Sequence, residues 1–217
     1  TAIRTDKEWE SQQGFIRACV AHIFHMKTAG EPFKRLIASG WKPTPQMADP
    51  DRYPVRIEVP AGPITVEGTR RNARMVVEYL EGWLNGRGAK GIDSLAGKPG
   101  IHPALMEDLA TGRMSVAQIA QRIRHAARDS QDGKTVHDMA LVSRLLREET
   151  DDILALLSAT VKDDRGRAAF AAAETRYRKA EKIAKRWIRN YTELDFRSLG
   201  SYTRAELDAI AAAPDAF

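Results

Sequence analysis

The sequence predicts a mainly α-helical chain that divides near residue 63 into a shorter mixed segment, 1–63, and a helical C-terminal domain, 64–217. Two observations support this division. Six of the chain's ten prolines lie between residues 43 and 63, where helices cannot continue for long. From residue 65 onward, apolar residues recur at steps of three and four, which is the period of an amphipathic helix.

The N-terminal segment contains two stretches with strand character. Residues 55–59, VRIEV, alternate apolar and polar side chains, as a short strand does. The stretch GFIRACVAHIFHM, residues 14–26, is apolar enough for a buried strand that leads into a helix, although its periodicity does not separate the two states.

The first helix of the C-terminal domain is predicted from an apolar stripe that begins at Val66 and ends before Gly86 and Gly88, a helix stop. A glycine-rich connection follows over residues 86–100, without the GKS or GKT of a phosphate-binding loop. Pro103 then opens a short helical element that Gly112 is expected to close.

Four further helices complete the domain, which has about five helices apart from the short element. Ser115 with Gln118 forms a predicted capping box for a helix through about residue 128, and Thr135 and Asp138 begin the next. A long alanine-rich helix is expected over roughly 165–190. Thr203 and Glu206 cap a last short helix.

Composition excludes several classes of protein. The 217 residues are 43% apolar, enough for a substantial core. The single cysteine excludes a disulfide framework and a multi-thiolate zinc site within the chain, and it indicates a reducing compartment, so a cytoplasmic location is expected. No apolar stretch is long enough to cross a bilayer, and no membrane association is expected.

The net charge of +5 is concentrated late in the chain. Residues 162–189 contain ten Lys or Arg against four acids, which is net +6. Such a stretch suits nucleic acid or an anionic cofactor. Because the basic residues are scattered around the predicted helix, a solvated face is the favoured interpretation.

Two adjacent carboxylates, Glu107 and Asp108, lie in the short element that follows Pro103. Successive helical residues are about 100° apart, so the two acids point in different directions. The spacing places Asp108 beside an apolar wall, which disfavours ionisation and makes a carboxylate a stronger base than in water, where its pKa is about 3.9. Such a group is suited to proton abstraction. The simpler alternative is that both acids lie in the first turn of a helix and have no catalytic role.

Other reactive residue types are not grouped. His22 and His25 could share a face, but the sequence marks no third ligand, so no metal site is predicted in this chain. Cys19 has no neighbouring base or cation, which predicts a buried structural thiol.

Four motifs in order, EGWLNGRG, ALMED, LATGRMS and QRIRHA, lie within residues 64–126, and this region resembles the C-terminal part of malate synthases. A fainter likeness covers residues 6–23, where DKEWESQQGF is similar to a segment that follows a late barrel strand in the family. The resemblance implies the helical C-terminal domain of a TIM-barrel enzyme, preceded by a remnant of the last barrel strand and helix.

The resemblance also implies an acyltransferase of the glyoxylate cycle that condenses acetyl-CoA with glyoxylate and hydrolyses the thioester to malate and CoA. By this resemblance Asp108 is the catalytic base and Met106 lines the substrate pocket. Magnesium is the implied cofactor, with its ligands on the barrel and outside this chain. No CoA-contacting residue is assigned.

A complete barrel needs about 250 residues, and only some sixty precede the helical part here. We therefore expect a C-terminal fragment, or a chain that works with a missing barrel portion and is inactive alone. Two alternatives remain open at this point. One is a stand-alone basic helical module that binds nucleic acid or protein, although nucleic acid is not the expected partner. The other is a lyase or thioesterase acting on malyl-CoA-type thioesters.

Overall fold

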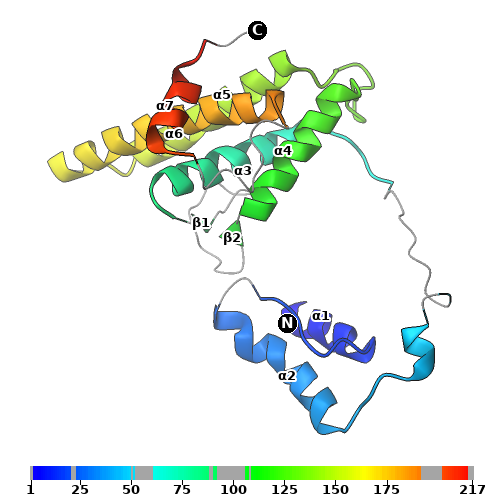
Figure 1. Ribbon diagram of the computed structural model, residues 1–217. Coiled ribbons are helices and arrows are strands. Elements are labelled where there is room, and N and C mark those ends of the chain that lie inside the picture. The colour runs from blue at the N-terminus through cyan, green and yellow to red at the C-terminus, as the bar shows by residue number, and fades with distance from the viewer. Residues whose placement is uncertain are drawn as a thin grey trace. The chain divides into compact units, whose positions relative to one another are not determined.

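The computed structural model describes residues 2–20, 23–49, 51, 61–87, 90–91, 106–107, 109–191 and 202–214. The chain divides into two compact units, Thr1–Ala61 and Gly62–Phe217. Helices dominate both units (Figure 1). Among the described residues, none of the helices combines the length and the apolar character that crossing a membrane requires.

The first unit is built on two helices that contact each other, α1 (Ala2–Gln12) and α2 (Met26–Ala38). Short 3-10 turns precede and follow α2, at Ile23–His25 and Pro45–Ala48. Buried Ala29 and Phe33 lie on α2, and an Arg35–Glu8 ion pair of 3.2 Å joins the two helices. The strand predicted over 55–59 lies outside the described residues.

The buried strand predicted within residues 14–26 is wrong for its first half. Residues 15–20 form no strand and are exposed, and Cys19, predicted to be buried, is exposed with them. A strand is stable only when neighbouring strands accept and donate its backbone hydrogen bonds, and no described residue pairs with this stretch. The second half forms the 3-10 turn and the start of α2.

The second unit contains five described helices and a two-stranded hairpin. The helices are α3 (Val66–Leu84), α4 (Leu109–Arg124), α5 (Met139–Ser158), α6 (Asp164–Arg189) and α7 (Arg204–Ala212). The strands are β1 (Lys90–Gly91) and β2 (Met106–Glu107). The predictions for the first, fourth and fifth helices are confirmed, including the capping box of Thr203 and Glu206.

Helix α3 lies at the centre of this unit and packs against α4, α5 and α6 (Figure 1). Its apolar stripe is fully enclosed at Ala73, Val76 and Val77. Trp187 of α6 and Ile119 of α4 are buried in the same core. The apolar side chains that recur at steps of three and four along α3 therefore contact helices on several sides. These contacts explain why so little of α3 remains exposed.

The start of α3 is fixed by the loop between α4 and α5. The Thr65 hydroxyl caps the helix by accepting the Gly68 backbone N–H, and the Val66 N–H donates to the buried Asp129 carboxylate at 3.1 Å. Ile64 and Ser130 exchange two further hydrogen bonds, of 2.9 and 2.7 Å. Because these bonds satisfy N–H groups that a helix start leaves without partners, α3 begins at a defined residue.

Candidate active site

The residues on either side of the predicted base, Asp108, lie where strand β2 of the hairpin is followed by helix α4. Strand β2 pairs antiparallel with β1, so that Glu107 lies opposite Lys90 and Met106 opposite Gly91. Helix α4 begins at Leu109. Asp108, the residue between them, lies outside the described residues, as does the side chain of Met106.

The predicted short helix over residues 103–112 is wrong at residues 106 and 107 and at its predicted end. Residues Met106 and Glu107 are extended, and α4 runs without interruption from Leu109 through Gly112 to Arg124. The argument that helical spacing sets Asp108 beside an apolar wall therefore fails. The position now follows a strand and directly precedes a helix whose first N–H groups favour an anion.

Gly112 lies inside α4 and does not end a helix, contrary to the prediction. Its role is to allow close packing against α3. A Cβ at this position would lie 3.2 Å from Cδ1 of buried Tyr79, closer than ordinary van der Waals contact. The glycine thus allows the first turn of α4 to approach the aromatic ring. A glycine is found both at helix ends and where two helices pack closely, and the sequence alone did not distinguish these two roles at Gly112.

The predicted capping box at Ser115 is also wrong, for a related reason. Ser115 is buried in α4, and its hydroxyl donates to Sδ of Met75 on α3 at 3.2 Å. Gln118 does not complete a cap: its Oε1 accepts a hydrogen bond of 2.8 Å from Asn72. Both side chains of the apparent capping motif therefore connect α4 to α3.

The second half of α4 is held to the start of α3 by Arg122. Its guanidinium donates to the Thr69 hydroxyl at 2.7 Å, and its burial lowers its pKa. Between this contact and Gly112, Val116 and Ile119 are fully buried against the core. Helix α4 is consequently fixed to α3 along its length.

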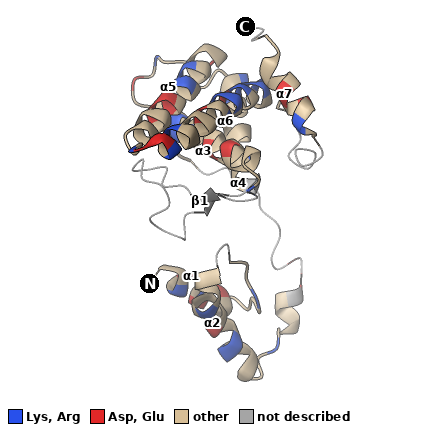
Figure 2. Cartoon of the chain, turned by 90° about the vertical axis from the view of Figure 1, so that its left-hand side faces the viewer, with Lys and Arg blue, Asp and Glu red and all other residues tan. Residues whose placement is uncertain are grey.

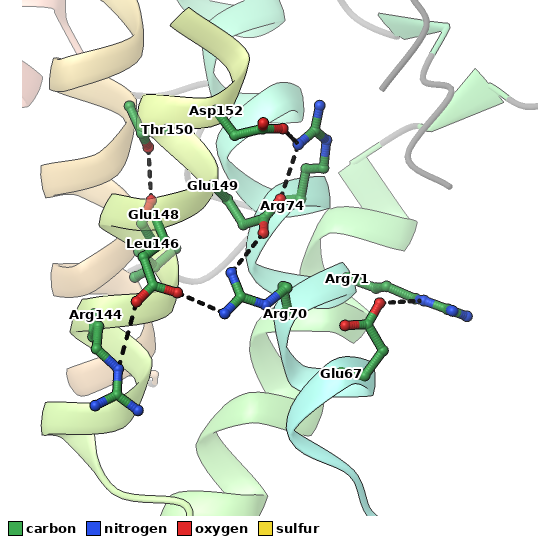
Figure 3. Close-up of polar contacts among 10 residues, drawn as sticks. All are labelled: Glu67, Arg70, Arg71, Arg74, Arg144, Leu146, Glu148, Glu149, Thr150 and Asp152. Atoms are coloured by element: carbon green, nitrogen blue, oxygen red, sulfur yellow. Dashed lines mark hydrogen bonds and ion pairs between the residues drawn. The ribbon is translucent and has the colours of Figure 1, made fainter. Parts of the chain in front are cut away.

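An ion-pair cluster fixes α3 in turn to α5 (Figure 3). Arg74 donates to Glu149 at 2.9 Å and to Asp152 at 2.7 Å, and Arg70 donates to Glu149 at 2.9 Å and to Glu148 at 2.6 Å. Burial of Arg74 alone would lower its pKa, but the hydrogen bonds and charges of Asp152 and Glu149 outweigh it, so the pKa is raised.

Two further polar contacts join α3 to α6. The Tyr177 hydroxyl donates to Glu78 at 2.8 Å, and Arg176 pairs with Glu81 at 2.8 Å. Burial raises the pKa of Tyr177, and the nearby charge of Glu78 raises it further, so the phenol stays protonated and acts as a donor. Sequence reasoning missed these contacts and the α3–α5 cluster alike. The only sequence signal for the cluster was the dense acidic run REETDD in α5 and its basic counterpart in α3.

The basic stretch 162–189 is partly neutralised within the fold. Among the described residues, at least five of its ten cations form ion pairs: Arg167 with Asp164, Arg176 with Glu81, Arg178 with Asp151 and Glu181, Lys179 with Asp208, and Lys185 with Glu181. Basic and acidic residues lie next to one another on α5 and α6 (Figure 2). This arrangement favours the solvated-face interpretation over a phosphate-binding surface.

No group of three or more His, Cys, Asp or Glu within the described ranges could hold a metal ion. His25 lies in the turn before α2, and His22 is outside those ranges. The described residues therefore do not fit a magnesium site.

The comparisons with known proteins converge on one family. The family described as "Malate synthase, C-terminal" matches residues 63–204. The chain is 31% identical to a malate synthase of Dictyostelium discoideum over 159 residues, which are 70% of this chain and 27% of that protein. It is 30% identical to a glyoxysomal malate synthase of Zea mays, covering 91% of this chain and 31% of that protein.

Malate synthase A of Escherichia coli (strain K12) is 31% identical, over 68% of this chain and 26% of that protein. The chain thus spans about a quarter to a third of the length of these relatives. No solved structure matches it significantly.

Proposed function

Since the chain belongs to the malate synthase family, we propose that it is the part of such an enzyme that supplies the catalytic base. The complete enzyme condenses acetyl-CoA with glyoxylate and hydrolyses the thioester to malate and CoA. The observation that carries the proposal is the family match over 63–204, which includes the junction of β2 and α4 where Asp108 stands in the sequence.

Asp108 is the proposed base that removes a proton from the acetyl methyl group. A base must be ionised, and the N–H groups at the start of α4 favour the carboxylate form. A thioester α-proton is far less acidic than a carboxylic acid, so the transfer also requires close positioning and a stabilised enolate. Met106, two residues earlier, is proposed to line the pocket that holds the acetyl group.

The electrophile and the stabilising charge are proposed to come from a barrel portion outside this chain. Magnesium, with glyoxylate oxygens completing its shell, would polarise the aldehyde there. This chain would contribute the base, its positioning and the exclusion of water from above the barrel.

The surface of the first unit supports a barrel partner. Six large apolar side chains of this 61-residue unit each expose more than half of their surface: Trp9, Phe15, Ile23, Phe24, Met26 and Ile37. A free unit of this size seldom leaves so many exposed, because each apolar contact with water is unfavourable. Contact with the remaining strands and helices of a barrel would cover such side chains.

The proposal is tested by measuring CoA release from acetyl-CoA and glyoxylate. The 217-residue chain alone should give no turnover, whereas a full-length assembly should be active. In that assembly Asp108→Asn should lower kcat by about 10² or more, as expected for a positioned acid–base group. Glu107→Gln, the adjacent carboxylate, is the matched control and should change kcat by only a few fold.

Turnover by the chain alone would overturn the need for a barrel partner. A loss below about tenfold in Asp108→Asn would overturn the assignment of the base.

A further inference from the structure

One histidine of the second unit is completely enclosed in the fold. His137 is 0% exposed and lies in the connection between α4 and α5, which we call the α4–α5 loop and define as residues 127–137. Histidine is the side chain whose charge ordinarily changes between pH 5 and 8. The surroundings of His137 therefore decide which protonation state the folded loop accepts.

The hydrogen bonds of this ring fix its tautomer. Nδ1 of His137 lies 2.9 Å from the carbonyl oxygen of Ala127, and because a carbonyl only accepts, Nδ1 carries a hydrogen and donates it. Nε2 of the neutral ring then has no hydrogen. Nε2 is buried, and no described residue forms a hydrogen bond with it. A protonated ring would therefore bury an N–H group and a charge without an acceptor, which is unfavourable.

The charged groups around the loop do not supply that acceptor. The ionisable residues of the loop and of the helix ends that adjoin it are Glu67, Arg70 and Arg71 of α3, Arg122 and Arg124 of α4, His125, Arg128, Asp129, Asp132, Lys134 and Asp138, and Arg189 of α6. The four carboxylates accept other hydrogen bonds, from Arg71 to Glu67, from Val66 and Gln131 to Asp129, from Lys134 and Thr135 to Asp132, and from Leu141 to Asp138. Within the described part of the chain, none of these groups pairs with Nε2.

The same loop holds the first residues of the second unit. The loop is closed by a 2.8 Å backbone hydrogen bond from Asp129 to Thr135. The Asp129 carboxylate accepts the Val66 N–H, and Ser130 exchanges two hydrogen bonds with Ile64. Because the second unit begins at residue 62, these contacts attach its connection to the first unit and the start of α3. Opening of the loop would release both.

We propose that the α4–α5 loop is an acid-sensitive switch, which is closed while His137 is neutral and opens when the ring takes up a proton. In the open loop the ring would be exposed to water and would protonate as an ordinary histidine does, at about pH 6.5 and below. The closed loop is therefore favoured above this pH, and opening is favoured as the pH falls through it. One proton that binds only to the open form raises the opening equilibrium about tenfold between pH 7.5 and pH 5.5.

The test is amide hydrogen exchange of the 217-residue chain, measured by NMR at pH 7.5 and pH 5.5. Protection factors are compared, because they remove the pH dependence of the intrinsic exchange rate. We expect the protection of the Val66, Asp129, Ser130 and His137 amides to fall about tenfold at pH 5.5. The Ile183 amide, in the buried part of α6, should change less than twofold. Carboxylates ordinarily titrate below this pH range and do not contribute.

Two asparagine variants separate His137 from general effects of acid. In His137→Asn the side-chain amide can donate to the Ala127 carbonyl in place of Nδ1 but does not titrate, so the fall in protection should shrink to less than twofold. His125→Asn changes an exposed histidine beside the loop and should keep the tenfold fall. Nitrogen chemical shifts of the His137 ring, measured in the unmodified chain, give a second readout that needs no variant. We expect Nε2 to stay unprotonated in the closed loop at pH 5.5.

Three outcomes would overturn the proposal. The first is equal protection of the loop amides at the two pH values in the unmodified chain. The second is a tenfold fall that persists in folded His137→Asn. The third is an Nε2 that is protonated at pH 5.5 while the loop amides keep their protection.

Discussion

The ion-pair cluster between α3 and α5 predicts that Arg74→Met destabilises the fold far more than Arg71→Met. The side chains of Arg74 and Glu149 expose only 8% and 10% of their surface, so their charge-assisted hydrogen bond is worth roughly 1.5–3 kcal/mol. The bond to Asp152, whose side chain is 58% exposed, adds about 0–1 kcal/mol.

The loss in Arg74→Met is therefore expected to be roughly 2–3 kcal/mol. The cost of about 3–5 kcal/mol for an uncompensated buried charge is not expected, because Glu149 retains Arg70 as a partner. Methionine also keeps much of the packing of the arginine stem.

Arg71 is the matched control on the same helix. Among the described residues Arg71 pairs with Glu67 alone, and the two side chains are 54% and 55% exposed, so Arg71→Met should cost no more than about 0.5 kcal/mol. Urea unfolding followed by far-ultraviolet circular dichroism measures both free energies. A double-mutant cycle with Glu149→Gln should give a coupling energy of about 1 kcal/mol or more. Equal losses in Arg74→Met and Arg71→Met would refute the reasoning.

Three further predictions concern the other contacts of α3 and α7. Gly112→Leu should lower the unfolding free energy by about 1–3 kcal/mol, since it overpacks the contact of α4 with α3; an unchanged urea midpoint would contradict this. Tyr177→Phe removes the donor to Glu78 and should cost about 1–2 kcal/mol, measured in the same assay. The pKa of Glu206 is lowered by hydrogen bonds from the backbone and hydroxyl of Thr203. A carboxylate whose pKa is lower in the folded state stabilises the fold at pH values above its unfolded pKa of about 4.3. This stabilisation is lost as the pH falls through the folded pKa. Protection of α7 amides from hydrogen exchange should therefore fall in acid, and less so in Glu206→Gln.

Local signals were sufficient where an element depends mainly on its own residues. The cap at Asp138, the periodic stripe of α3 and the reciprocal cap of Thr203 and Glu206 are short-range features, and the structure has each of them. The long helix predicted over 165–190 is observed as Asp164–Arg189.

Proline and glycine misled where packing overrides their usual signal. Helix α2 continues through Pro32, which is buried, although a proline inside a helix removes a hydrogen bond and usually ends it. Gly112 and Ser115 both carry standard signals of a helix boundary, and both lie inside α4 in contact with α3. A boundary signal and a packing requirement use the same residue types.

The sequence by itself determined the mainly helical fold class, the apolar stripes of the helices, two of the helix caps and the family motifs. Each of these depends on residues close together in the chain. Only the tertiary structure decided that α4 is continuous, that α3 is the central helix, and that Arg70 and Arg74 meet carboxylates some 75 residues away. Those features depend on which side chains share a buried environment, and burial is a property of the assembled helices.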